Sequence, residues 1–334
     1  MSSGFPTGCG ARVRGASSRA RPVLVSGARG FVGRHLVAAL EATGRPVRCG
    51  SRSAHSDAPS RPGVTWVRAD VGDRASLAQA LAGCDAAFYL VHGMGTGPGY
   101  AGRERAQAEI FRDEAARAGV HRLVYLGAVE PAGRPSQHLA SRLETGRILR
   151  SGAVSCVELR AAMIVGAGSE SWQIVRDLSA RLPVMVLPRW LRNRSQPIGV
   201  EDAVEALLAA LELPLRGSAC FDIPGPETLS HRELLRRVSL RRGREAWMLD
   251  VPMLTPRLSS HWIRFVTRAN FTIARELVDG LTSDLLAGPD TLWAQLGSGP
   301  RVDLDRAIER ALADEEAASL APAGLGPATA RRLA

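Results

Sequence analysis

Short apolar runs alternate with amphipathic helical patterns through the first two thirds of the chain. The runs occupy 23–26, 46–51, 64–70, 86–91, 121–128 and 154–165, and the helical patterns occupy 31–43, 74–82, 102–118, 136–150 and 171–181. Buried strands alternating with helices of about ten to fifteen residues predict βαβ units in a parallel sheet with helices on both faces. Right-handed crossovers then place a ligand crevice at the carboxyl ends of the strands.

The pattern changes at Leu182, where prolines begin to interrupt the chain. The elements expected beyond this point are helices at 200–211, 231–242, 258–267 and 271–285 and strands at 220–223 and 247–251. These shorter elements predict a small cap over the ligand edge of the sheet. The predicted fold class is therefore α/β, a doubly wound parallel sheet with a small C-terminal α+β cap.

Glycines at three-residue spacing follow the first apolar run. Residues 23–33 read VLVSGARGFVG and lead directly into a helical pattern. Gly27 permits a tight turn, Gly30 lets the backbone approach a pyrophosphate, and Gly33 lets the helix pack close to the sheet. Free N–H groups and the positive end of the helix dipole then face the anion. This segment predicts a Rossmann dinucleotide site, with contacts from Gly27, Ala28, Arg29, Gly30, Phe31, Val32 and Gly33.

These patterns divide the chain into four predicted parts. Residues 1–21 are rich in Ser, Gly and Arg, and we expect a disordered leader, with a transit peptide as the second interpretation. Residues 22–213 form a Rossmann NAD(P)-binding domain, in which 154–200 contributes to the substrate edge. Residues 214–315 form a C-terminal cap or substrate subdomain, and residues 316–334 form an Ala-rich tail that frays.

The end of the second strand favours a phosphorylated cofactor. NAD-binding chains carry an acidic residue there for the ribose 2′-hydroxyl, whereas residues 48–52 of this chain read RCGSR. Arg52, helped by Arg29, is placed to bind a 2′-phosphate, so NADP(H) is preferred over NAD(H). The alternative is two surface arginines in an arginine-rich chain. Further cofactor contacts are expected from Ser51, Asp70, Val71, Val91, His92 and Gly93, with Asp70 accepting from the adenine amino group.

Several segments together resemble one known family. The glycine loop with residues 69–71, 159–162 and 196–203 resembles atypical or extended short-chain dehydrogenases/reductases (SDRs). The likeness is strongest to the NAD(P)H-binding, NmrA-like branch, which includes the accessory Rossmann subunit of respiratory complex I. Residues 89–94, 182–185, 188–190 and 254–260 resemble a bacterial subgroup labelled NAD(P)-binding or nucleoside-diphosphate-sugar epimerase-like. The resemblance covers residues 22–315 and implies a dinucleotide cofactor with oxidoreductase or epimerase-like chemistry.

The resemblance implies a Ser ending the fifth strand and a Tyr-x-x-x-Lys on the next helix. This chain contains no lysine, its fifth strand ends YLGA at 125–128, and the Tyr and Lys positions fall on His138 and Arg142. Spacing of i and i+4 puts both on one helix face, and histidine titrates in the range useful for acid–base catalysis. His138 and Arg142 are therefore the candidate catalytic pair. The alternative is a partly exposed His138 and an Arg142 that pairs with Glu144 or Glu109.

Three residues near the cap are candidate substrate contacts: Arg160, Met163 and Trp190. Arg160 ends the sixth strand, where it either orients substrate or pairs with Asp202. Aromatic and Met residues of the cap could line an apolar pocket or form ordinary core. His92, in the glycine-rich loop 92–97, lies at the expected rim of the site or simply in a flexible loop.

Composition excludes several classes of protein. The chain is 45% hydrophobic without an apolar run of about eighteen residues, so a membrane span is not expected. Five scattered cysteines without C-x-x-C spacing predict a reducing, cytoplasmic compartment and no metal site. The formal charge is +10, but four arginines lie in the leader, so a solvated face is favoured and nucleic acid is an unlikely partner.

Two functions remain open for what we expect to be a monomer or weak dimer. The first is an NADP(H)-dependent atypical SDR oxidoreductase or epimerase-like enzyme acting on an unidentified small molecule. Its proton would come from His138, His92 or an ordered water. The second is a non-catalytic NADP(H) redox sensor or assembly protein of the NmrA-like type, whose conformation a protein partner recognises. The departures at the Ser, Tyr and Lys positions favour the sensor, and the large cap favours the enzyme.

Overall fold

The computed structural model describes residues 20–53, 61–93, 97, 99–181, 184–245, 247–251 and 271–320. The predicted helix at 258–267 lies outside the described residues, as do residues 1–19 of the predicted leader and 321–334 of the predicted tail.

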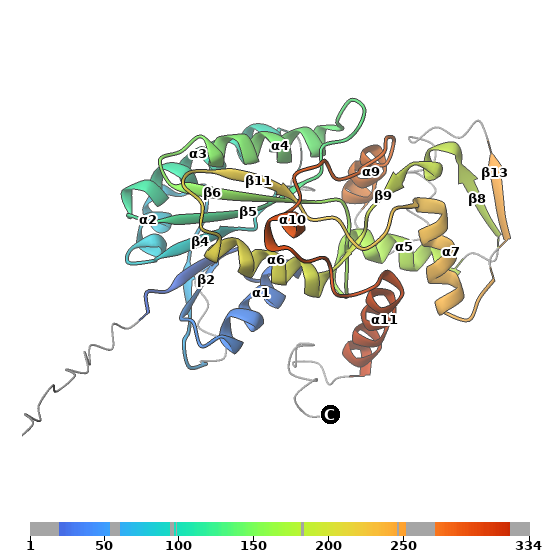
Figure 1. Ribbon diagram of the computed structural model, residues 1–334, viewed down its shortest axis with the longest axis horizontal. Helices are drawn as coiled ribbons and strands as arrows, with labels where there is room; N and C mark the ends of the chain where they lie inside the picture. Colours follow the sequence, from blue (N-terminus) through green and yellow to red (C-terminus); the bar gives the residue numbers. More distant parts are fainter. Residues whose placement is uncertain are drawn as a thin grey trace, which may run out of the picture.

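A seven-stranded parallel sheet forms the centre of the molecule (Figure 1). Its strands are β1 (Val23–Ser26), β2 (Val47–Ser51), β3 (Val64–Arg68), β4 (Ala86–Tyr89), β5 (Arg122–Ala128), β6 (Ser155–Ala161) and β11 (Ala219–Asp222). They lie in the order β11-β6-β5-β4-β1-β2-β3, and every neighbouring pair is parallel. The strand order reverses between β1 and β4, and ligands of such sheets bind at this switch point. The predicted α/β, doubly wound fold is confirmed.

Helices cover both faces of the sheet, as the alternating pattern predicts (Figure 1). One face packs against α1 (Phe31–Ala42), α6 (Val200–Glu212) and the short α10 (Leu292–Leu296), and the other against α2 (Arg74–Leu81), α3 (Tyr100–Arg117) and α4 (Gln137–Arg150). Every residue of β1, β4 and β5 is buried. Burial from both sides explains why these strands appear in the sequence as continuous apolar runs.

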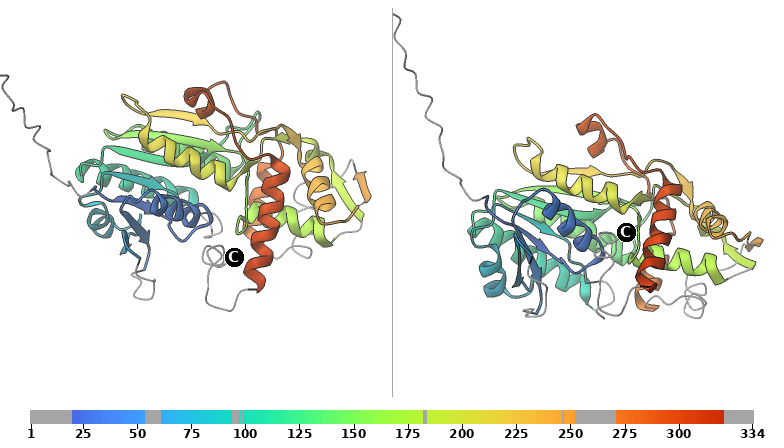
Figure 2. Two further views of the ribbon diagram at one scale, coloured as in Figure 1. Left: turned by 60° about the horizontal axis from the view of Figure 1, so that its bottom comes forward. Right: turned by 90° about the horizontal axis from the view of Figure 1, so that it is seen from below.

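The cap is built from two separate stretches of chain. The first stretch precedes α6 and contains α5 (Glu170–Arg181), β8 (Val184–Pro188), the 3-10 helix η1 (Arg189–Arg192) and β9 (Arg194–Ser195). The second stretch follows β11 and contains β12 (Leu229–Ser230), α7 (His231–Arg241), β13 (Trp247–Val251) and α9 (Phe271–Gly280). Strand β8 pairs with β13, and β9 pairs with β12. Figures 1 and 2 show α5, α7, β8 and β13 gathered at one end of the molecule, away from β2.

Several predicted boundaries differ from the structure. The strand expected in the cap at 220–223 belongs to the main sheet as β11, because it pairs in parallel with β6. The strand expected at 154–165 divides into β6 and β7 (Ile164–Val165), which pairs with β10 (Ile198–Gly199) instead of the main sheet.

The helices of the C-terminal region also differ from their predicted limits. The helix expected to reach Leu285 ends at Gly280. Helix α11 (Leu304–Leu320) runs across the predicted start of the tail at 316, and its buried face packs beside α5 and α7. Within the described part of the chain, no helix is both long and apolar enough to cross a membrane.

Candidate active site

The glycine loop between β1 and α1 has the backbone that its spacing predicts. Gly27 has φ of +76°, a left-handed conformation that favours glycine, and a Cβ there would lie 2.7 Å from the Leu90 carbonyl oxygen. A Cβ on Gly33 would lie 2.2 Å from the Gly27 carbonyl oxygen. Side chains at either position would therefore force the loop away from the sheet or from α1.

The N-terminus of α1 fits the pyrophosphate of a dinucleotide. Its N-cap is Gly30, which offers no side chain to the first-turn N–H groups, and the first turn contains no acidic residue. Gly30, Phe31, Val32 and Gly33 all line a pocket. Uncapped N–H groups at a helix N-terminus form an anion site, reinforced by the helix dipole.

Arg29 and Arg52 lie on the β2–β3 side of this loop. The Arg29 guanidinium lies over the Trp66 ring, 5.3 Å from its centroid. Trp66 belongs to β3 and pairs with Cys49 of β2, and the exposed Arg52 directly follows β2. The stacking contact with Trp66 has no signal in residue spacing and was not foreseen from the sequence. It holds a positive charge over β3, on the side of the loop where the ribose of a bound dinucleotide is expected.

Two predicted contacts on this side have structural roles. One Asp70 carboxylate oxygen accepts from the Gly72 N–H at 2.9 Å, while the Asp70 N–H donates to the Ser76 hydroxyl at 3.1 Å. Val71 is 4% exposed and packs in the core, so it can offer a ligand only its backbone. Val91 also packs against that core.

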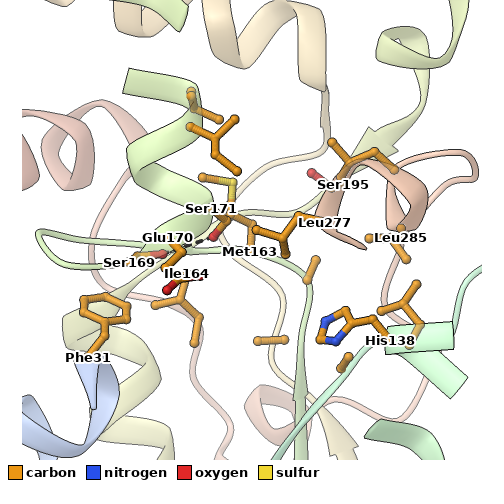
Figure 3. Close-up of a pocket in the computed structure, with 18 of the residues that line it drawn as sticks. Phe31, His138, Met163, Ile164, Ser169, Glu170, Ser171, Ser195, Leu277 and Leu285 are labelled. Carbon is orange, nitrogen blue, oxygen red and sulfur yellow. Dashed lines mark hydrogen bonds between the residues drawn. The ribbon is translucent and has the colours of Figure 1, made fainter. Parts of the chain in front are cut away.

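A cavity of about 440 Å³ connects the glycine loop with the cap (Figure 3). It brings together nine predicted site residues from distant parts of the chain: Gly30, Phe31, Val32, Gly33, His92, His138, Arg142, Met163 and Trp190. Figure 3 shows Phe31 and His138 on opposite sides, with Met163 and Ile164 between them. The predicted residues on the β2–β3 side of the loop do not line this cavity: Arg29, Ser51, Arg52, Asp70 and Val71.

Two histidines meet at the sheet end of the cavity. His138 comes from the first turn of α4, and His92 follows β4. Burial and the charge of Arg142, with a smaller effect of His92, lower the pKa of His138 to about 3. The surrounding protein atoms and, after them, the charge of Arg142 lower the pKa of His92 to about 4, although the side chain is exposed where it borders the cavity. Both imidazoles are therefore neutral at pH 7, when each retains one N–H donor and one acceptor nitrogen.

Arg142 is fixed by contacts with β5. Its guanidinium donates to the Leu126 carbonyl and lies 5.9 Å from the centroid of the Tyr125 ring, while the Tyr125 hydroxyl donates to the Arg142 carbonyl at 3.0 Å. The predicted alternative of an ion pair with Glu144 is wrong, because Glu144 pairs with Arg105. No carboxylate of the described residues lies within ion-pair distance of Arg142. Its positive charge is therefore available to the cavity.

Glu104 of α3 is a site residue that sequence analysis missed. It is 5% exposed and accepts from the Gly93 N–H and from the Ser141 hydroxyl. It thereby ties the loop that carries His92 to the helix that carries His138. Its partners lie 11 and 37 residues away, and only the fold brings them together.

Arg160 has a structural partner outside the cavity. Its Nε donates to Asp222 at 2.6 Å, and the second Asp222 oxygen accepts from the Gly288 N–H at 2.6 Å. The predicted pairing with Asp202 is wrong, because that carboxylate accepts from the backbone N–H groups of residues 301 and 302. Arg160 does not line the cavity. The structure thus joins β6 to β11 through this ion pair.

Comparison with known proteins agrees with this arrangement. Residues 27–176 match the family model described as NAD(P)H-binding. The (4-alkanoyl-5-oxo-2,5-dihydrofuran-3-yl)methyl phosphate reductase of Streptomyces griseus subsp. griseus is 29% identical over 231 residues, which are 66% of this chain and 74% of that protein.

Solved structures share the fold at lower sequence identity. MoeE5 in complex with UDP-glucuronic acid and NAD has a TM-score of 0.67 at 19% identity, over 87% of this chain and 98% of its own. The Bordetella bronchiseptica enzyme WbmG in complex with NAD has a TM-score of 0.67 at 17% identity, over 91% and 95% of the two chains. Residues 27–176 therefore resemble an NAD(P)H-binding family, and the solved structures share the Rossmann-like fold of this chain.

Proposed function

We propose that this protein is an NADP(H)-dependent oxidoreductase of the atypical SDR type, acting on a small carbonyl compound or the corresponding alcohol. The observation that carries the proposal is the continuous cavity from the glycine loop past His138 and Arg142 into the cap. Its size suits a cofactor's reactive end together with a small substrate. The S. griseus relative, a reductase by name, supports reduction as the direction.

The chemistry follows from two neighbouring side chains of α4. The bound nicotinamide would supply or accept the hydride. His138 occupies the position where the family places its tyrosine, and its neutral N–H can donate a hydrogen bond to a carbonyl oxygen. Neutral imidazoles polarise carbonyls in this way elsewhere. The nearby Arg142 charge then stabilises the negative charge that develops on that oxygen.

Arginine contacts on the β2–β3 side support NADP(H) over NAD(H). Arg52 is exposed directly after β2, and Arg29 is held over Trp66 on the same side of the loop. The end of β2 carries no acidic residue for a ribose 2′-hydroxyl. Two guanidinium groups there favour a dianionic 2′-phosphate through charge-assisted hydrogen bonds.

Calorimetric titration with NADP⁺, NADPH, NAD⁺ and NADH tests this cofactor preference. Arg52→Ala and Arg29→Ala should each weaken NADPH binding by about 1.5–3 kcal/mol, because a phosphate contact is lost. Neither change should alter the affinity for NADH. Arg61→Ala serves as the control, because Arg61 pairs with Glu41 near the start of β3. Equal losses for both cofactors, or tighter NADH binding by the wild type, would contradict the preference.

A non-catalytic NADP(H) sensor is the second candidate. It is favoured because the fifth strand ends at 125–128 without a serine, and because His138 and Arg142 stand at the expected Tyr and Lys positions. This function predicts unequal affinities for NADP⁺ and NADPH and no cofactor turnover with any carbonyl compound. A screen that follows NADPH absorbance, with His138→Ala as the inactive control, separates the two functions.

A further inference from the structure

The cap end of the cavity is an apolar chamber. Its walls come from α5, η1, α7, α9 and the segment after α9, and its apolar lining consists of Ile174, Val175, Leu178, Leu191, Leu235, Leu277, Val278, Leu281 and Leu285. Figure 3 shows Ser195 at the end of the cavity remote from Phe31, near Leu277 and Leu285. A ligand reaching this end from His138 would be surrounded mainly by hydrocarbon.

Three residues that line this chamber each carry a buried polar atom with no hydrogen-bond partner among the described residues. The atoms are the Ser195 hydroxyl, His231 Nε2 and Trp190 Nε1. Ser195 is 1% exposed and His231 is 6% exposed. Buried polar atoms are nearly always paired in folded proteins, and an unpaired one costs free energy. Three in one chamber indicate a partner that belongs to a ligand.

The fold explains why two of these residues lie together. Ser195 ends β9, which pairs with β12, and His231 directly follows β12 as the first residue of α7. The backbone N–H of His231 donates to the Asn193 carbonyl at 3.2 Å. This bond fixes the position of His231 beside β9. Burial lowers the pKa of His231 to about 4 despite the nearby Asp284 carboxylate, which leaves the imidazole neutral.

The charges around the cavity limit what can bind in the chamber. Arg142 is the one cationic side chain among the described lining residues other than histidine, and it comes from α4, which is not a wall of the chamber; the acidic Glu170 begins α5. A phosphate there would lose its water without gaining a cation. Trp190 Nε1 can only donate, whereas the Ser195 hydroxyl and a neutral imidazole can donate or accept. An uncharged oxygen that accepts hydrogen bonds meets all three requirements.

We propose that Ser195, His231 and Trp190 form a specificity subsite for an uncharged, hydrogen-bond-accepting oxygen at the distal end of an otherwise apolar substrate. Ketone, ester, lactone and ether oxygens have this chemistry. The inference rests on the proposed function in one respect, namely that the reacting carbonyl lies at the His138 end. It predicts discrimination by the presence of the distal oxygen, because an analogue without it leaves the buried polar atoms unpaired.

The test compares probes that differ in the distal oxygen. Calorimetry on the full chain saturated with NADP⁺, which cannot reduce a ketone, would measure binding of methyl 7-oxooctanoate and methyl 9-oxodecanoate. The matched hydrocarbons are 2-decanone and 2-dodecanone, and UDP-glucose is the charged probe. We expect at least one ester to bind about tenfold more tightly than its matched ketone, and UDP-glucose to bind more weakly than either.

Variants assign this advantage to the subsite. Ser195→Ala and His231→Phe should remove the ester's advantage and leave the Kd of the ketone unchanged. Ser195→Ala should also keep the wild-type Tm, because it removes a hydroxyl without a protein partner. Ser179→Ala is the matched control, since its buried hydroxyl donates to the Leu235 carbonyl at 3.2 Å and it does not line the cavity. That variant should retain the full advantage.

Several results would overturn the subsite. They are equal binding of ester and ketone, tighter binding of UDP-glucose, an advantage that survives both variants, or no binding of any probe. Failure of the proposed function gives different signals. If NADP⁺ does not bind, the ester–ketone comparison on the free protein still decides the subsite. If the esters bind selectively but NADPH is never consumed, the subsite stands and the sensor replaces the enzyme.

Discussion

At the residue scale, the unusual feature is the Arg142 guanidinium, which has no carboxylate partner in the described part of the chain and lies near two neutral imidazoles. Arg142 is held by a backbone carbonyl and an aromatic ring, which fix its position without neutralising its charge. Desolvation first, and then the same charge, lowers the pKa of His92 and of His138. The permanently charged arginine therefore adds to the effect of desolvation in keeping both imidazoles neutral.

The role of His138 predicts a loss of rate without a loss of cofactor binding. His138→Ala removes the imidazole N–H proposed to donate to the substrate oxygen and should lower kcat about 100-fold, as the loss of one oxyanion-stabilising donor does. NADPH affinity should stay at the wild-type value by calorimetry. His121→Ala is the control, because His121 pairs with Asp85. Wild-type kcat in the His138 variant would refute its catalytic role.

The lowered pKa values also predict the pH dependence of turnover. Since His138 and His92 titrate at about 3 and 4, neither should change protonation between pH 5 and 8. The profile of kcat/KM should therefore show no histidine inflection in that interval. An inflection near 6.5, the ordinary histidine pKa, would show that these imidazoles are solvated in the working enzyme.

At the scale of elements, one buried carboxylate organises the site. Glu104 on α3 joins the loop after β4 to α4 through Gly93 and Ser141. Glu104→Ala should lower the free energy of unfolding by about 2–3 kcal/mol, because hydrogen bonds to a charged group are lost. It should also raise KM, since His92 and His138 lose their common support. Urea unfolding and steady-state kinetics measure the two effects.

The control for Glu104 lies on the same helix. Glu109 is exposed, and Glu109→Ala should change the free energy of unfolding by no more than about 0.5 kcal/mol. If the two variants were equally stable, or if Glu104→Ala kept the wild-type KM, Glu104 would have no organising role.

At the scale of the whole molecule, buried neutral histidines link folding to pH. His231 has a folded pKa of about 4 against an ordinary value of 6.5. Between these values the unfolded chain binds a proton that the folded protein does not, so His231 lowers the free energy of unfolding as pH falls. Urea midpoints of wild type and His231→Gln at pH 7.5 and 4.5 measure this contribution. The wild type should lose more stability than the variant.

Comparison with a variant is needed because other buried groups act in the opposite direction. Burial raises the pKa of Glu158 and Glu276, so these carboxyls favour the folded state as pH falls. Their effect is common to wild type and His231→Gln and cancels in the difference. Equal losses in the two proteins would mean that His231 titrates normally in the folded state.

Much of the fold was predictable because its determinants are local. The apolar strands and helical patterns that build the sheet appear directly in residue periodicity, and Ser136 marks the start of α4 by accepting from the Leu139 N–H. The glycine spacing identified the loop because a side chain at Gly27 or Gly33 would clash with a backbone carbonyl oxygen. Segment 220–223 was misplaced because nothing local distinguishes a sheet strand from a cap strand.

The sequence by itself determined the parallel sheet, the glycine loop and the pairing of His138 with Arg142 on one helix face, since all three depend on neighbours within a few residues. Only the tertiary structure decided that His92 joins that pair, that Glu104 supports both, and that Ser195 and His231 meet in one chamber. These contacts link residues far apart in the chain. Their positions follow from how strands order and cap elements pack, which no spacing along the chain encodes.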